Sequence, residues 1–207
     1  MKFAEFKKLV KDIPVFSVPQ LSPLAKDKQT FRNQISQWKK QGLIIPLKKG
    51  LYILNEHDRK LNLSREYIAN QLVFPSYVSL EYALSFYGFI PERAFQVTSI
   101  TSKKTTEFVN AYGTFFYRNL KTELFFGYTN LRDENGMQIL LAEKEKAFLD
   151  LLYLNLSQIN PDHPNFLEES YRFENLDELD KSRLLNYSEK FQSKKLIRLI
   201  QTLIHQR

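Results

Sequence analysis

A run of amide and basic side chains between residues 28 and 41 has the composition of a surface that reads DNA bases. Phe31, Ile35 and Trp38 are spaced as i, i+4 and i+7, which predicts a helix with one narrow apolar face. The rest of this helix carries no carboxylate, and the residues that we expect to contact DNA are Lys28, Gln29, Arg32, Asn33, Ser36, Gln37 and Lys40. Amides can pair bidentately with adenine, and cations with guanine, in the major groove. An ordinary solvent-exposed helix is the alternative, although such helices usually mix glutamate with lysine.

The elements before this helix are those that would position it. Residues 2–11 interleave lysines with apolar residues at helical spacing, which predicts a first helix. Ser17 is a good N-cap for a short second helix, and Asp27 is a good N-cap for the helix over 28–41. Gly42 ends that helix, because glycine adopts the left-handed backbone of a helix terminus readily.

A basic hairpin is predicted directly after the polar helix. The β-prone runs 43–47 and 51–54 flank a glycine-containing turn, with Lys48 and Lys49 at its tip. Three helices followed by such a hairpin favour a winged helix-turn-helix, with one helix in the major groove and the hairpin on the adjacent backbone. We therefore expect Lys48 and Lys49 to contact phosphates, and we assign residues 1–58 to a winged helix-turn-helix DNA-binding domain.

The distribution of charge along the chain supports a polyanionic partner. Residues 1–54 hold 11 Lys+Arg against 3 Asp+Glu, whereas residues 61–180 hold 10 against 17, and residues 181–207 hold 7 against 1. Cations gain affinity for nucleic acid by releasing counterions from phosphates, so duplex DNA is the expected partner. A solvated basic face without a partner is the alternative reading of charge alone.

Composition excludes several classes of protein. The 207 residues are 43% hydrophobic and 14% aromatic, which is enough for a real core. The absence of cysteine excludes disulfides and Cys-ligated zinc. No apolar run approaches the roughly 20 residues of a membrane helix. We expect a cytoplasmic protein with no membrane association.

The remainder of the chain, residues 59–207, is expected to form an α+β domain. Ser64 and Ser79 are potential N-caps of two helices. Four or five short β-prone runs between residues 95 and 141, including 123–128, predict a small antiparallel sheet. Helical patterns return from Ala142 and again over 187–205. The predicted fold class is thus α+β, with a winged helix-turn-helix, a small antiparallel sheet and C-terminal helices.

This second domain shows no catalytic signature. It has no glycine-rich phosphate loop, and the three histidines of the chain are far apart. Glu143 and Glu145 alternate with lysines early in a helix and are interpreted as solvated charges. We therefore expect no catalytic residues, metal or cofactor. A basic surface is a candidate contact for phosphates, although it could serve solubility alone: Lys103, Lys104, Arg118, Lys194, Lys195 and Arg198.

Most of the chain resembles the AbiEi antitoxin family. The resemblance lies in residues 77–92, which begin Tyr-Val-Ser-Leu-Glu-Tyr-Ala-Leu, in residues 97–105, and in the helix over 142–154. The N-terminal arrangement that ends in Lys-Gly-Leu-Tyr at 49–52 is also similar to that family's winged helix. Residues 155–207 match least well.

The resemblance implies a bacterial antitoxin that is also a transcriptional autorepressor. Such proteins bind inverted repeats in an operator of their own promoter through the winged helix. The C-terminal domain of the family neutralises a nucleotidyltransferase-like toxin without forming a stable complex with it. The residues themselves leave alternatives open: a nuclease or nucleotidyltransferase targeted by a winged helix, a transcriptional regulator unrelated to any toxin, or an RNA-binding or protein-binding module.

Overall fold

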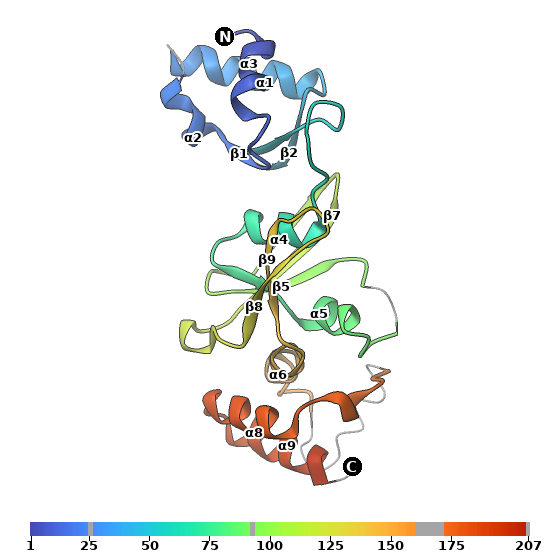
Figure 1. Ribbon diagram of the computed structural model, residues 1–207. Coiled ribbons are helices and arrows are strands. Elements are labelled where there is room, and N and C mark those ends of the chain that lie inside the picture. The colour runs from blue at the N-terminus through green and yellow to red at the C-terminus, as the bar shows by residue number, and fades with distance from the viewer. Residues whose placement is uncertain (25–26, 92–93, 160–171, 206–207) are drawn as a thin grey trace.

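The computed structural model describes residues 1–24, 27–91, 94–159 and 172–205. Figure 1 shows an elongated molecule in which a smaller N-terminal part sits above a larger C-terminal part. We use "N-terminal part" for residues 1–58 and "C-terminal part" for the described residues from 59 onward. The chain is mixed α+β, as the sequence predicts. In the described ranges, no helix has the length and apolar character needed to cross a membrane.

The N-terminal part packs three helices against a three-stranded antiparallel sheet. Its elements are α1 (Phe3–Val10), β1 (Phe16–Ser17), α2 (Val18–Leu21), the 3₁₀ turn η1 (Ser22–Leu24), α3 (Lys28–Lys40), β2 (Ile44–Lys48) and β3 (Leu51–Leu54). The strand order is β1-β3-β2. Aromatic rings hold α1 to α3, and the centroids of Phe6 and Trp38 lie 4.6 Å apart.

The predicted helices and hairpin of this part are confirmed to within a residue or two at their ends. Ser17 and Asp27 cap α2 and α3 with their side chains, as expected. Strand β1 was not predicted, because two residues are too short to show a periodic pattern. It pairs with β3 through Phe16 opposite Tyr52 and closes the sheet on the side away from β2.

The C-terminal part is built on a six-stranded sheet covered by helices. Its strands are β4 (Ser76–Val78), β5 (Val97–Thr101), β6 (Thr106–Asn110), β7 (Gly113–Asn119), β8 (Tyr128–Arg132) and β9 (Gln138–Ala142). Its helices are α4 (Arg65–Leu72), α5 (Leu80–Phe86), α6 (Lys144–Leu154), α8 (Lys181–Lys190) and α9 (Lys194–His205), with 3₁₀ turns η2 (Thr122–Leu124) and η3 (Leu176–Glu178).

The prediction of a small antiparallel sheet is wrong. The strand order is β6-β7-β5-β4-β9-β8, and the pairs β5–β7 and β4–β9 are parallel. The hairpin β6–β7 folds back so that β7, and not β6, lies beside β5. Alternating side chains identify strands but say nothing about which strand becomes the neighbour.

Two further predictions in this part are corrected. Residues 123–128 do not form a strand, because 122–124 make the turn η2 and β8 begins only at Tyr128. The single helix expected over 187–205 is two helices, α8 and α9, separated at Gln192, which has a left-handed φ of 53°. No glycine or proline lies at that break. The helical spacing of apolar residues continues across it, and the sequence pattern therefore predicts one helix.

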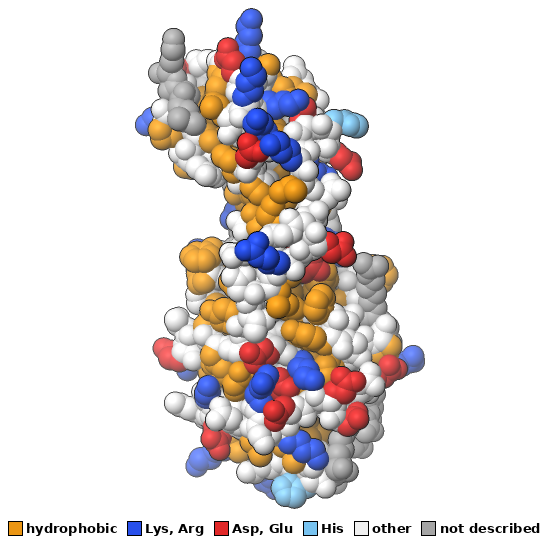
Figure 2. All heavy atoms as spheres, viewed as in Figure 1, with side chains coloured by type: hydrophobic (Ala, Val, Ile, Leu, Met, Phe, Trp, Pro, Cys, Tyr) orange, Lys and Arg blue, Asp and Glu red, His pale blue; other side chains and the backbone are white. Residues whose placement is uncertain are grey.

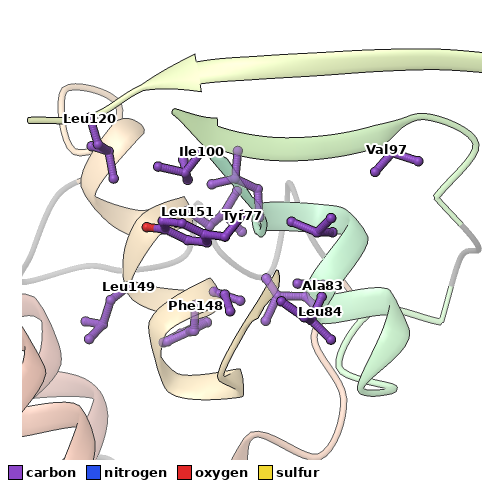
Figure 3. Close-up of a cluster of buried hydrophobic side chains, with 14 of the residues drawn as sticks. Tyr77, Ala83, Leu84, Val97, Ile100, Leu120, Phe148, Leu149 and Leu151 are labelled. Carbon is purple, nitrogen blue, oxygen red and sulfur yellow. The ribbon is translucent and has the colours of Figure 1, made fainter. Parts of the chain in front are cut away.

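The core of the C-terminal part extends into the N-terminal hairpin. Leu47 of β2 and Ile53 of β3 belong to the buried cluster of the C-terminal part. Figure 3 shows the middle of this cluster, where Tyr77 of β4 lies among side chains of α5, α6 and β5. The N-terminal part also has a buried cluster of its own around Phe6, Phe31 and Trp38. A boundary at residue 58 therefore separates two cores, except that Leu47 and Ile53 belong to the C-terminal one.

Candidate nucleic-acid interface

The helix α3 is fixed at both ends by local hydrogen bonds. The carboxylate of Asp27 accepts from the amide of Thr30 at 2.6 Å, and hydrogen bonding to the side chain and then to the backbone of Thr30 lowers the pKa of Asp27. At the other end Gly42 adopts a φ of 70°, which lets the amide of Leu43 donate to the carbonyl of Trp38 at 2.9 Å. The register of the helix, and thus the direction of each side chain, is set by these two ends.

One face of α3 is buried, and the opposite face is exposed. Phe31, Ile35 and Trp38 are buried against α1 and the sheet, which confirms the predicted apolar face. All seven predicted contact residues on the helix are exposed: Lys28, Gln29, Arg32, Asn33, Ser36, Gln37 and Lys40. The Gln29 amide donates to the Asn33 side chain at 3.3 Å, so two amides lie side by side on this face.

The cations of α3 lack carboxylate partners in the part of the chain that the structure describes. The ion pairs of the N-terminal part lie elsewhere: Lys7 pairs with Asp58 and Asp12 with Lys60, both at 2.5 Å, and Glu56 pairs with Arg59 at 4.0 Å. Lysine and arginine side chains are spread over the visible face of this part in Figure 2. The α3 face is consequently a set of hydrogen-bonding amides with uncompensated positive charge around it.

The two lysines of the hairpin do not share one environment. Lys49 is exposed at the tip. Lys48 is half-buried, donates from Nζ to the carbonyl of Leu72, and lies 5.7 Å from the ring centre of Phe108. Burial, with the nearby charge of Lys103, lowers the pKa of Lys48. Lys48 thus joins the hairpin to the C-terminal part, which the sequence pattern did not reveal.

The basic residues predicted in the C-terminal part fall at two places. Lys103 and Lys104 are exposed in the connection between β5 and β6, near Lys48. Arg118 is half-buried on β7. Helix α9, which carries the exposed Lys194, Lys195 and Arg198, lies at the end of the molecule away from the N-terminal part. The structure therefore does not gather these cations into one surface (Figure 1).

A buried polar network in the C-terminal part was missed by sequence reasoning. Lys146 and Asp150 of α6 form an ion pair with both side chains fully enclosed. The carboxylate of Asp150 also accepts from the hydroxyls of Tyr77 at 3.0 Å and Ser79 at 2.9 Å. Burial lowers the pKa of Lys146 and raises that of Asp150, while each charge opposes the shift of the other. The i,i+4 spacing of Lys146 and Asp150 within an apolar helix was the available signal.

The interpretation of the early α6 carboxylates as solvated charges is also wrong for Glu145. Its side chain is buried, accepts from the amide of Asp180 at 3.0 Å and lies 3.6 Å from Arg183. Glu143 is half-buried and accepts from the hydroxyl of Tyr187 at 2.8 Å. Both carboxylates tie α6 to α8. No group of three or more potential metal ligands occurs within the described ranges.

No protein-family model matches the chain, and no curated protein matches it. The geometry of α3 and the hairpin is therefore the evidence on which a DNA-binding assignment rests.

Proposed function

We propose that the chain binds duplex DNA through α3, as a winged helix-turn-helix. The order helix, strand, helix, helix, strand, strand and the sheet order β1-β3-β2 support this proposal. In this arrangement α3 enters the major groove, and the β2–β3 hairpin is the wing. The observation that carries the proposal is the exposed α3 face, which offers amides and cations and contains no carboxylate.

The proposed DNA contacts are of two kinds, hydrogen bonds to bases and charge contacts to phosphates. Asn33 and Gln37 are one turn apart on the exposed face and suit bidentate pairing with bases. Lys28, Lys40 and Lys49 suit phosphates, because they are exposed point charges. Lys48 is left out of the proposed contact set, since its ammonium already has a partner in Leu72.

We further propose that the DNA-binding protein is a bacterial antitoxin and autorepressor, as its resemblance to the AbiEi family implies. The three stretches that carry the resemblance meet in one place. The Thr98 hydroxyl donates to the Ser79 carbonyl at 2.8 Å, and the Ser79 hydroxyl donates to Asp150. The three stretches therefore contribute to one core. Antagonism of a nucleotidyltransferase-like toxin rests on the resemblance alone.

A salt titration of the full chain tests DNA binding. Fluorescence anisotropy with duplex DNA from upstream of the gene should show log affinity falling with log salt by about 0.9 per phosphate contact. Arg32→Ala should weaken binding, whereas Lys121→Ala, an exposed cation of the C-terminal part, should not. Affinity that stays flat with salt, or equal affinity for an RNA duplex of the same sequence, would contradict the proposal. The full chain is needed because Leu47 and Ile53 are buried in the C-terminal core.

Growth rescue tests the antitoxin role. Cells that express a nucleotidyltransferase-like protein from the neighbouring gene should recover growth when the full chain is co-expressed. Because the cations lie in two places, Lys103→Glu with Lys104→Glu can be compared with Lys194→Glu with Lys195→Glu. Loss of rescue in one pair would identify the working surface. Failure of the unmodified chain to rescue would contradict the role.

A further inference from the structure

A groove of about 640 Å³ lies between α4 and the β8–β9 hairpin, and no residue of α3 is part of its lining. Its volume falls within the range of sites for small ligands, roughly 300–1,000 Å³. The side chains that matter for its chemistry are Tyr67, Gln71, Phe74, Asn130, Arg132 and Gln138. None of the functions proposed above uses this groove.

The floor of the groove is rigidly built. Asn70 on α4 accepts from the amide of Leu140 at 2.7 Å and donates to the carbonyl of the same residue at 3.4 Å. Both ends of the Asn70 amide are therefore occupied in joining α4 to β9. The Ser76 hydroxyl donates to the Val73 carbonyl at 2.6 Å and fixes the chain after α4. These polar groups position the walls and are not available to a ligand.

Four of the remaining polar side chains have no hydrogen-bond or ion-pair partner within the described ranges. The amides of Gln71, Asn130 and Gln138 are exposed and make no side-chain hydrogen bond there. Arg132 is likewise exposed and forms no ion pair with any described carboxylate. The carboxylate of its neighbour Asp133 accepts instead from the backbone amides of Asn135 at 3.0 Å and Met137 at 2.8 Å.

An exposed aromatic ring also lines the groove. Phe74 is 75% exposed although phenylalanine is ordinarily buried. It lies in the same lining as the half-buried Tyr67. Exposed aromatic rings beside amides and a guanidinium are the groups with which proteins stack on, and hydrogen-bond to, unpaired bases.

We propose that this groove binds an unpaired nucleobase together with one phosphate. Phe74 stacks on the base, the three amides hydrogen-bond its edge, and Arg132 holds the phosphate. Amides favour adenine, with which they pair bidentately. The single guanidinium matches a nucleoside monophosphate or one internal phosphate of a single strand, because a triphosphate would keep most of its charge uncompensated.

Calorimetry of the full chain tests this site with AMP, adenosine, the other nucleoside monophosphates and a short single-stranded oligo(dA). Phe74→Ala should weaken AMP binding at least about five-fold, since loss of base stacking commonly costs that much or more. Phe74→Tyr should retain binding. Arg132→Ala should weaken AMP but leave adenosine unchanged. Phe95→Ala, which removes another exposed ring of the same part, and Lys121→Ala are the matched controls and should bind AMP normally.

The two sources of the base are distinguished in the same experiment. Saturation by AMP identifies a free nucleotide, and saturation by oligo(dA) alone identifies a single strand. Absence of saturable binding by any probe at millimolar concentration overturns the proposal, as does binding that is equal in Phe74→Ala, Arg132→Ala and the unmodified chain. The result is independent of duplex binding, because Arg32→Ala should lower duplex affinity and leave AMP affinity intact.

Discussion

The hydroxyl of Ser79 donates to the carboxylate of Asp150 at 2.9 Å, although Ser79 occupies the N-cap position of α5. Its side chain makes no capping hydrogen bond to that helix. The residue type that predicted a helix start is thus used to satisfy a buried charge on α6. Asp150 receives two hydroxyl donors and the Lys146 ammonium, which suits a carboxylate with no access to water.

Removal of Asp150 alone should lower the free energy of unfolding far more than removal of both Lys146 and Asp150. Asp150→Ala leaves the Lys146 ammonium buried without its partner and should lower the free energy of unfolding by about 3–5 kcal/mol. Lys146→Met combined with Asp150→Leu removes both charges and should recover much of that loss. Urea unfolding of both variants measures the difference. Equal losses would mean that the two side chains do not act as a pair.

Trp38 should be a structural residue. It is buried on the inner face of α3 beside Phe6, so Trp38→Ala should destabilise the protein by about 3–5 kcal/mol. Because the chain has one tryptophan, its fluorescence reports on this site alone. Acrylamide should quench that fluorescence weakly in the folded protein and strongly in urea. Strong quenching in the folded state would reverse the assignment of the two α3 faces.

Asn33 and Gln37 should determine sequence preference. Their replacement by alanine should cost about 1–3 kcal/mol of discrimination between operator and mismatched duplex if each pairs bidentately with a base. Gln201→Ala, which removes an exposed amide from α9, is the control. Anisotropy competition with matched and mismatched duplexes measures the preference. Unchanged discrimination in the α3 variants would contradict the proposed docking.

Lys48 and Lys49 should have different roles despite being adjacent. Lys49→Ala should lower affinity for all duplexes and reduce the salt slope by about 0.9. Lys48→Met should leave DNA affinity unchanged and lower the free energy of unfolding by about 1 kcal/mol, because the hydrogen bond to Leu72 is lost. Equal effects of the two substitutions on DNA affinity would show that Lys48 reaches the phosphates.

The Asp27 cap should make the stability of α3 depend on pH in the acid range. The pKa of Asp27 is lowered below its ordinary value of 3.8 by the hydrogen bond from Thr30. A lowered folded-state pKa gives stability that is present above the ordinary value and is lost as pH falls through the folded-state value. The difference in Tm between the unmodified chain and Asp27→Ala should therefore be constant near neutral pH and shrink below pH 3.8. A difference that persists at lower pH would contradict this cause.

Prediction from the sequence succeeded where local chemistry decides the structure. Ser17, Asp27 and Ser64 were identified as capping residues from type and spacing, and each accepts the expected backbone hydrogen bond. The buried and exposed faces of α3 followed from periodicity alone.

Features that depend on distant partners were not predictable in the same way. The placement of β7 beside β5 and the burial of Lys146 arise from contacts between remote segments. Lys48 could not be distinguished from Lys49, because the difference lies in Leu72 and not in the neighbouring residues. The groove beside α4 has no sequence motif, since its lining comes from three separate stretches of chain.

The anchoring of β2 has a consequence for how the molecule moves in solution. Leu47 is buried in the C-terminal core, and the Leu47 carbonyl accepts from the Asn110 side chain at 3.0 Å. Two bodies joined only by residues 55–63 would reorient at separate rates. A strand held by both couples their rotation, so the backbone amides of α3 and α6 should report the tumbling of one elongated particle.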